Sequence, residues 1–384
     1  MAAAPAPGAD PGPQGAGTRS VNLPVPPWLV RRFLLAPLMP VLLVLAIVAW
    51  PVLTLAQALV AAVLFLTTSR DIRWRLPRVW SFVVVYLCAE CLCLGACLVL
   101  WPLAATRRGR TSDRSAAAHL AVLRAFLGVL IDVAEFVFRF RLVVDEPLGH
   151  PEDEASMAAP APLVVLARHA GPGASLVLVH LLIDTYRRCP RIVLKEQLRL
   201  DPAVDVVLSR LGCGFIRNGP GAGDRAAAQV AAVAGAMSGR DALVLFPEGK
   251  DWTPTRHRAA VDLLRRRGRR KEAARAARLD HVLPPRPAGA LAALAAAPDA
   301  DVVIFTHTGH DDMRDLRSVW TRLPLRHDLH MVWWRVPADQ LPEGSEATTT
   351  WLFDTWERID AWIDEQTDLS GLTRSHGDAA AVRG

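Results

Sequence analysis

The sequence lacks the marks of several classes of protein. It has only six cysteines among 384 residues, and four of them fall in one apolar segment with no histidine or carboxylate cluster beside them. Neither a disulfide framework nor a zinc site is therefore indicated. No internal repeat is visible. The net charge of +6 is modest, so it suits an anionic membrane surface but does not argue for nucleic acid.

The first 27 residues have almost no bulky apolar side chains and are rich in Ala, Pro and Gly. Such a segment cannot bury enough surface to offset the entropy of ordering, so we predict a disordered tail over residues 1–27. The basic start, short apolar core and cleavage site of a signal peptide are missing as well. We predict a second, flexible tail over residues 371–384.

Apolar residues are what the sequence has in excess, at 52% of the chain. Residues 33–66 contain no charged side chain, and this run is longer than the roughly 20 residues that cross a bilayer as a helix. Pro40 and Pro51 interrupt the run. We therefore predict either one tilted, kinked helix or a re-entrant helical hairpin that turns near Trp50.

A second apolar run covers residues 80–103 and holds one charged residue, Glu90. The two runs predict membrane-embedded helices over residues 28–105, and the alternative is a pair of buried core helices in a soluble protein. Glu90 has no evident partner, which favours a structural or bundle-facing role over a functional one. Arginines flank both runs in nearly equal numbers, so charge does not decide the orientation of the helices.

Strand and helix patterns alternate after the apolar runs, which is typical of an α/β fold. An amphipathic helix is expected first, over residues 117–133. Strands are then expected over 138–144, 163–167, 191–194, 214–216, 242–246, 302–305 and 330–335, and helices over 175–186, 204–211, 224–237 and 348–368. We predict one α/β domain over residues 115–370.

A histidine on a glycine-rich turn follows the strand expected at 163–167. Residues 168–175 read RHAGPGAS, and His169 is the only histidine set between a strong strand and a helix. The glycines let the backbone approach a ligand closely, and the start of the helix near Ser175 favours nearby negative charge. A base in this position fits the chemistry of a site, although a capping or surface histidine gives the same local pattern.

A second turn with a carboxylate follows another strand. Residues 243–246 are compact and apolar and end in Pro247-Glu248-Gly249, which we expect to leave Glu248 exposed at the carboxyl end of the strand. Open α/β sheets bind ligands at that edge. The alternative is a solvated glutamate in an ordinary strand-end loop.

Together with the intervening residues 212–218 (GCGFIRN), these segments resemble the HxxxxD, GxxFIxR and Glu-Gly motifs of the 1-acylglycerol-3-phosphate acyltransferases, a lysophospholipid acyltransferase family. Further segments, 252–254, 281–289 and 351–358, resemble the branch that includes eukaryotic endomembrane lysophospholipid acyltransferases. The resemblance covers residues 120–365. It implies a mixed sheet flanked by helices, like that of glycerol-3-phosphate acyltransferase, behind an N-terminal membrane-embedded helical region.

The resemblance also implies an activity. An integral membrane enzyme, with its catalytic domain on the cytoplasmic face, would transfer a fatty acyl group from an acyl-CoA or acyl-carrier thioester to the sn-2 hydroxyl of lysophosphatidic acid or a related lysophospholipid. The acyl donor is a substrate, and no cofactor or metal is implied. His169 would be the general base. The implied substrate-binding residues are Arg168, Gly173, Ser175, Phe215, Ile216, Arg217, Pro247, Glu248, Gly249, Lys250 and Arg286.

Three departures from the family pattern bear on that activity. Ala174 stands where the motif aspartate would orient the histidine. In the middle block, residues 212–218, Arg217 comes one place earlier than the arginine of the GxxFIxR motif. In the third block, residues 248–251, Lys250 and Asp251 stand where the family favours threonine and arginine. Lys250, Arg286 or Arg168 could bind the phosphate instead. The alternative function is that of a catalytically impaired homologue that binds lipid as a membrane scaffold.

Two other features could indicate nucleic-acid or metal binding, and another interpretation is favoured for each. The arginine-rich residues 256–278 lack interleaved aromatic side chains, so a solvated helix face or a contact with lipid headgroups or coenzyme A phosphates is favoured over nucleic acid. His307 and His310 suggest a metal site by composition alone, but no third ligand is suitably spaced. The partners that we expect are the acceptor lipid, the thioester donor and membrane lipids.

Overall fold

A mixed sheet of seven strands is the centre of the computed structural model, which describes residues 25–63, 70–104, 113–145, 148, 157–169, 172–216, 222–309, 320–325 and 328–381. The strand order is β1-β7-β6-β2-β5-β3-β4, and only β6 and β7 pair antiparallel. The strands are β1 (Arg141–Val144), β2 (Leu163–Ala167), β3 (Cys189–Lys195), β4 (Gly214–Ile216), β5 (Asp241–Leu245), β6 (Asp301–Thr308) and β7 (Asp328–Val336). The α/β class and the mixed sheet are thus confirmed, while the likeness to glycerol-3-phosphate acyltransferase stays a prediction.

Helices cover both faces of this sheet. Before it come α1 (Trp28–Val30), a π-helical turn (Arg31–Leu35), α2 (Ala36–Val63), α3 (Arg70–Val99), α4 (Trp101–Ala104) and α6 (Asp113–Phe138). Among the strands lie α8 (Pro172–Asp184), a 3₁₀ turn (Glu196–Leu200), α9 (Pro202–Arg210), α10 (Ala222–Gly235), α11 (Pro254–Arg266), α12 (Arg270–Ala276) and α13 (Pro287–Ala296). A 3₁₀ turn (Ala338–Gln340) and α15 (Ser345–Ala381) end the described chain.

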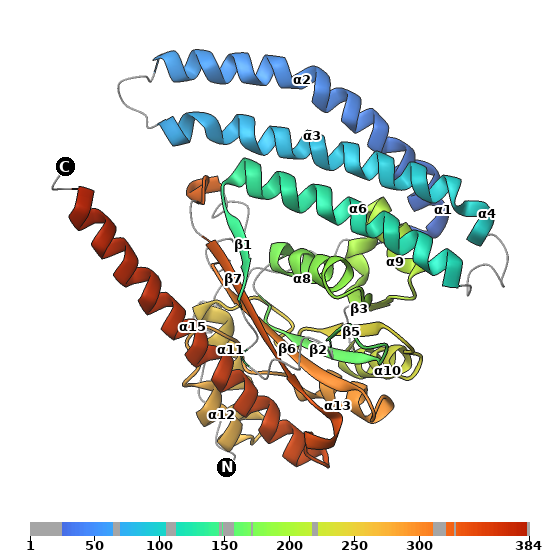
Figure 1. Cartoon of the computed structure of the whole chain (residues 1–384), viewed down its shortest axis with the longest axis vertical. Coiled ribbons are helices and arrows are strands. Elements are labelled where there is room, and N and C mark those ends of the chain that lie inside the picture. Colours follow the sequence, from blue (N-terminus) through green and yellow to red (C-terminus); the bar gives the residue numbers. More distant parts are fainter. Residues whose placement is uncertain are drawn as a thin grey trace, which may run out of the picture.

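The apolar side chains of the central strands alternate between the two faces of the sheet and form two apolar cores. Val165 of β2 faces one core, with α6, α8 and α9, whereas its neighbour Val164 faces the other, with α10, α13 and α15. Successive side chains of a strand point to opposite faces, so a continuous apolar strand feeds both cores. Figure 1 shows the resulting layers, with α6 and α8 on one side of the sheet and α13 and α15 on the other.

The apolar N-terminal segment forms two long helices, α2 and α3, of which α2 is the outer one (Figure 1). The helix continues through Pro40 and Pro51, so the hairpin turning near Trp50 does not form and a single helix is observed. Two stretches, Trp28–Val60 and Trp74–Val99, are long and apolar enough to cross a membrane, by length and composition only. They suggest, weakly, that the protein associates with membranes.

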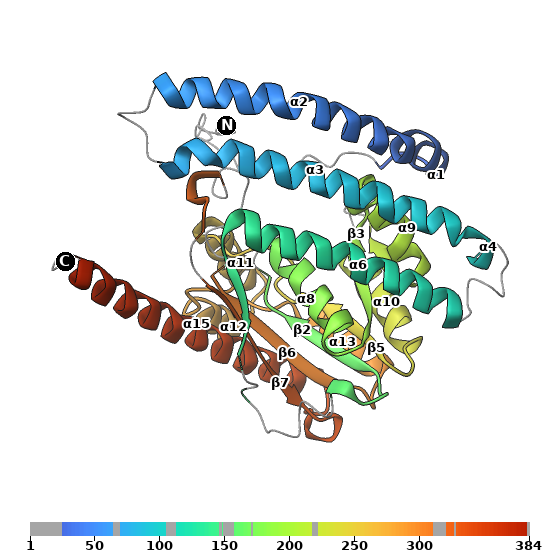
Figure 2. The same ribbon diagram turned by 45° about the horizontal axis from the view of Figure 1, so that its top comes forward.

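The second helix is also part of the α/β core. Cys93 and Cys97 of α3 are buried in the same core as Leu127 of α6, whereas α2 packs on α3 and leaves most of its apolar side chains exposed. Figures 1 and 2 show α2, α3 and α6 stacked in succession over the face that α8 covers. Glu90 is fully buried, and its Oε1 accepts a hydrogen bond from the backbone N–H of Ala203 at 2.8 Å, which fits the structural role expected for it.

Several element boundaries differ from those expected. The strand predicted at 138–144 begins only at Arg141, because α6 continues to Phe138 and Arg139 then adopts a φ of 58°, a left-handed conformation that ends helices. The last helix begins at Ser345 and extends to Ala381, into the segment predicted as a flexible tail. Residues 1–24 of the predicted disordered tail lie outside the described residues.

Candidate active site

His169 and Glu248 meet at the carboxyl edge of the sheet. They follow β2 and β5, which are parallel neighbours that pair Leu166 with Leu245, so both chain segments leave the sheet at the same edge. The backbone N–H of His169 donates a hydrogen bond of 2.9 Å to Oε1 of Glu248. Two segments that are 79 residues apart are thereby joined by a direct contact.

The expectation that Glu248 is exposed is wrong, because the side chain is 1% exposed. Its second oxygen, Oε2, accepts a hydrogen bond of 2.9 Å from the backbone N–H of Leu283. The carboxylate therefore turns inward to satisfy two backbone donors that the turns would otherwise leave unpaired. Burial raises the pKa of Glu248 to about 7, against the opposing effects of Arg168 and of these two hydrogen bonds.

The imidazole of His169 lies beside a carboxylate from the third block. Nδ1 of His169 is 2.7 Å from Oδ1 of Asp251, and the two side chains are 21% and 20% exposed. The contact does not meet the geometry of a good hydrogen bond, as is common in sites without substrate. The ring also meets Phe246 edge to face, with centroids 5.2 Å apart.

Asp251 is held in place from both sides along the chain. Before it, the turn after β5 is closed by the hydrogen bond of 3.0 Å from the N–H of Gly249 to the carbonyl of Phe246, and Gly249 adopts a φ of 69° that glycine favours. After it, the hydroxyl of Thr253 caps α11 by accepting from the N–H of Arg256 at 3.2 Å. The carboxylate is therefore positioned by fixed backbone on each side.

Three further members of the first motif lie at the start of α8. Gly173 is exposed and Ser175 is half-buried, whereas Ala174 is buried and offers only a methyl group. Because α8 begins where β2 ends, its N-terminus lies at the same edge as His169, and unpaired backbone N–H groups there favour negative charge.

Arg168 is buried inside the protein. Its side chain is 1% exposed, and the guanidinium donates hydrogen bonds to the carbonyls of His307 (2.6 Å) and His281 (2.9 Å). Its backbone N–H continues the sheet by donating to the carbonyl of Phe305 at 3.0 Å. Arg168 thus ties the end of β2 to β6 and to the loop that carries His281, so its guanidinium is not among the phosphate ligands proposed below.

Two exposed cations of the predicted binding set do lie close together. Arg286 passes over the turn after β5, since a Cβ at Gly249 would be 3.4 Å from its Nη1. Its backbone N–H donates to the carbonyl of Pro247 at 2.9 Å. Partial burial and then the charge of Arg286 are the main causes that lower the pKa of Lys250, with smaller effects from two further cations, Arg256 and Lys195. The carboxyl edge of the sheet therefore carries concentrated positive charge.

The middle block is only partly described. Phe215 and Ile216 are half-buried on β4, whereas Arg217 and Asn218 lie outside the described residues. Phe215 has the guanidinium of Arg199 4.1 Å above its ring centroid. With Glu196, Arg225, Ala228 and Gln229, Phe215 and Ile216 line an open cavity of about 550 Å³ beyond the carboxyl end of β3.

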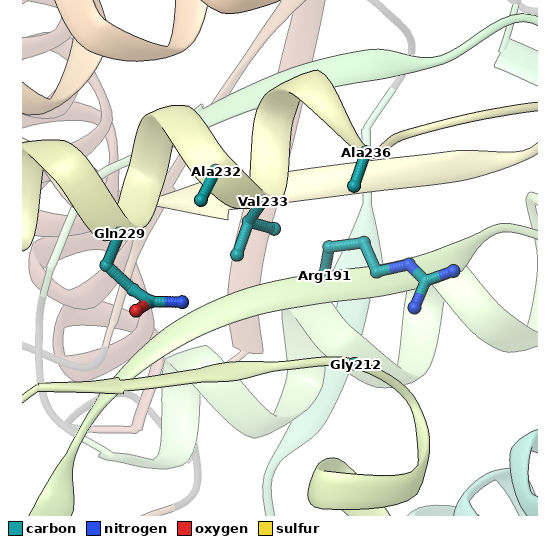
Figure 3. Close-up of a pocket in the computed structure, with 6 residues that line it drawn as sticks. All are labelled: Arg191, Gly212, Gln229, Ala232, Val233 and Ala236. Atoms are coloured by element: carbon teal, nitrogen blue, oxygen red, sulfur yellow. The ribbon is translucent and has the colours of Figure 1, made fainter. Parts of the chain in front are cut away.

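A second cavity, of about 280 Å³, is not part of this site. It is lined by Arg191, Gly212, Gln229, Ala232, Val233 and Ala236 (Figure 3). Arg191 is held there by an ion pair of 3.0 Å with Asp241, the first residue of β5. The cavity therefore lies toward the amino end of the strand that carries Glu248 at its other end.

The described residues add no support for a metal site or for nucleic-acid binding. His307 is 2% exposed on β6, and His310 lies outside the described residues. Within the part of the chain that is described, no group of three or more His, Cys, Asp or Glu side chains is placed to bind a metal ion. The arginine-rich segment forms α11 and α12, with Arg265, Arg266 and Arg267 exposed.

Sequence reasoning missed three residues that build the site. Leu283 supplies a backbone donor to Glu248. Asp360 of α15 accepts from the N–H groups of Asp280, His281 and Val282, at 3.0, 2.7 and 3.2 Å, and so holds the loop that carries Leu283. Only Asp251 left a signal in the sequence, because it brings a carboxylate into the third block of a chain that lacks the one expected at position 174.

One comparison with known proteins finds a match in the central part of the chain. Residues 152–308 match the family model described as Acyltransferase, and this range includes β2, the helix that follows it, β5 and the two motifs that meet at the sheet edge. The match supports acyl transfer as the reaction class. Neither a curated protein nor a solved structure matches the chain significantly.

Proposed function

We propose that the chain is a membrane-bound acyltransferase that moves a fatty acyl group from an acyl-CoA or acyl-carrier thioester to the sn-2 hydroxyl of lysophosphatidic acid or a related lysophospholipid. The observation that carries the proposal is the contact between the two motifs, in which the backbone of His169 is bonded to the buried Glu248. This contact sets a histidine at the ligand-binding edge of the sheet. The match of residues 152–308 supports the reaction class.

In the proposed reaction His169 is the general base. It accepts the proton of the acceptor hydroxyl as the oxygen attacks the thioester carbonyl, the C–S bond breaks, and the proton then passes to the leaving thiolate. A tetrahedral oxyanion forms on the way, and backbone donors at the start of α8 are available at the same edge to stabilise it. Glu248 holds the histidine loop and takes no part in proton transfer.

The acceptor phosphate is proposed to bind Lys250 and Arg286. Both are exposed next to the turn that carries Glu248, and the catalytic domain would lie on the cytoplasmic face with α2 and α3 in the membrane. Arg217 of the middle block is a further proposed ligand. Among the residues predicted to bind substrate, Pro247 is buried and Gly173 is exposed at the start of α8.

The test of the proposed function is thioester-dependent acylation of a panel of lysophospholipids by membranes that contain the protein. Transfer of acyl groups to lysophosphatidic acid above the level of control membranes would support it. The alternative, a lipid-binding scaffold, is favoured only by Ala174, and it predicts lipid binding without transfer to any acceptor.

Replacing Lys250 or Arg286 with alanine should weaken binding of the phosphate-bearing acceptor. A hydrogen bond to a charged group contributes about 1.5–3 kcal/mol, so KM for lysophosphatidic acid should rise by about tenfold or more in each variant. KM for a monoacylglycerol, which has no phosphate, should stay unchanged. Lys271→Ala, which removes an exposed lysine from α12, is the matched control. Equal effects on both acceptors would contradict a phosphate contact.

Removing residues 1–27 should leave the protein in the membrane. The long apolar helices begin at Trp28 and supply the proposed attachment, so the shortened chain should sediment with membranes after a carbonate wash. The full-length chain is the control. Recovery of the shortened chain in the supernatant would show that α2 and α3 belong to a soluble fold.

A further inference from the structure

We infer that Asp251 is the positioning residue that orients His169, in place of the carboxylate missing at position 174. The inference rests on the proposed function and deepens it, because it assigns a partner to the base. Its foundation is the distance of 2.7 Å from Nδ1 of His169 to Oδ1 of Asp251. A carboxylate beside one ring nitrogen fixes the tautomer, so the other nitrogen faces the substrate as proton acceptor.

The position of Asp251 suits this role better than that of an incidental surface ion pair. Both side chains are about one-fifth exposed, so their contact is partly shielded from water and salt. The backbone of Asp251 is fixed between the turn at Gly249 and the Thr253 cap of α11. A base and its orienting group both held by ordered backbone need little reorganisation when the substrate binds.

The groups around the pair leave Asp251 as the orienting carboxylate. Glu248 also approaches His169, but its two oxygens already accept backbone hydrogen bonds from His169 and Leu283. Arg256 lies on the far side of Asp251, with Nη1 3.6 Å from Oδ2, and its Nη1 also donates to the carbonyl of Asp251 at 3.2 Å. One oxygen of Asp251 thus faces the arginine while the other faces the histidine.

In the transfer step Asp251 keeps its charge. The proton of the acceptor hydroxyl moves to Nε2 of His169 as the C–O bond forms, the tetrahedral oxyanion then collapses with cleavage of the C–S bond, and Nε2 returns the proton to the thiolate. The proton on Nδ1 stays between His169 and Asp251 throughout. The carboxylate stabilises the imidazolium that exists between the two transfers, so its effect falls on kcat rather than on acceptor binding.

The experiment compares Asp251→Ala with wild type in the full-length chain, in membranes. The turnover number should fall by about 10²- to 10⁴-fold, with KM for lysophosphatidic acid changed by no more than about threefold. Asp262→Ala is the matched control, since it removes a carboxylate that is 54% exposed on α11 and pairs with Arg265. Added formate, and separately the second substitution Ala174→Asp, should each restore at least about tenfold of the lost turnover.

Two results would overturn the role of Asp251. One is a turnover number within about threefold of the Asp262→Ala control. The other is a loss that neither formate nor Ala174→Asp restores, because Asp251 would then act through the fold and not through the histidine. Inactivity of the wild type on every thioester and lysophospholipid is a different outcome, since it removes the proposed function itself.

Discussion

His169→Ala is expected to lower the turnover number by about 10²-fold or more, the range that a positioned base contributes. The reason is that the acceptor hydroxyl is a poor nucleophile until its proton is removed, and alanine leaves no group at this place to accept it. Residual activity from binding and from the oxyanion donors should remain. Initial rates with lysophosphatidic acid and an acyl thioester, at saturating concentrations of both, are the measurement.

His330→Ala is the matched control for this variant. His330 lies on β7, two strands away from β2, and pairs with Asp145 at 3.2 Å. Its removal should leave the turnover number unchanged. Full activity of His169→Ala would rule out the proposed mechanism, because His169 could then not be the base.

Glu248→Gln is expected to lower both stability and activity. An amide has one acceptor oxygen, so one of the two N–H groups that bond Glu248 would face an NH₂ donor instead. Leaving a buried donor unpaired costs about 1–3 kcal/mol, and the loosened loop would misplace His169. The measurements are the thermal midpoint of unfolding in detergent, followed by tryptophan fluorescence, and the turnover number.

The pH dependence of stability gives a second readout for the same residue. The pKa of Glu248 is raised by burial from 4.5 to about 7, so between these values the folded protein binds more protons at this site than the unfolded chain. The free energy of unfolding of wild type should therefore fall as pH rises from 4.5 to 7, by about 1.4 kcal/mol for each unit of pKa shift, and then level off.

Glu248→Gln should remove this pH-dependent part of the free energy of unfolding. Glu343 is an exposed glutamate before α15, so Glu343→Gln should keep it. A variant at position 248 with the same midpoint, the same turnover number and the same pH dependence as wild type would contradict the structural role of the buried carboxylate. Loss of activity with unchanged stability would instead indicate that Glu248 contacts the substrate.

The sequence predicted the alternation of strands and helices because apolar runs and turn residues are local signals. It placed His169 after β2 and the Glu-Gly turn after β5 for the same reason, and both positions agree with the observed elements. Local signals fail where a distant partner decides the conformation. The sequence predicts an exposed Glu248 in its turn, yet hydrogen bonds from the N–H groups of His169 and Leu283 hold its side chain buried.

The partner of His169 illustrates the same limit. Ala174 stands at the place of the motif aspartate, five residues after the histidine, so the motif itself supplies no carboxylate. Asp251 is 82 positions from His169, and only the parallel pairing of β2 with β5 brings the two segments to one edge. Asp251, two places after Gly249, gains its proposed role from sheet topology, which spacing along the chain does not reveal.

The packing of α3 joins the apolar N-terminal helices to the α/β domain. Its cysteines share a core with α6 and α8, Glu90 holds the start of α9, and Arg31 in the preceding π-helical turn forms an ion pair of 3.0 Å with the buried Asp205 of α9. No cut between the apolar helices and the sheet would leave both pieces intact, since each holds half of a buried contact. The proposed anchor and the α/β domain therefore share buried contacts, which separating them would expose.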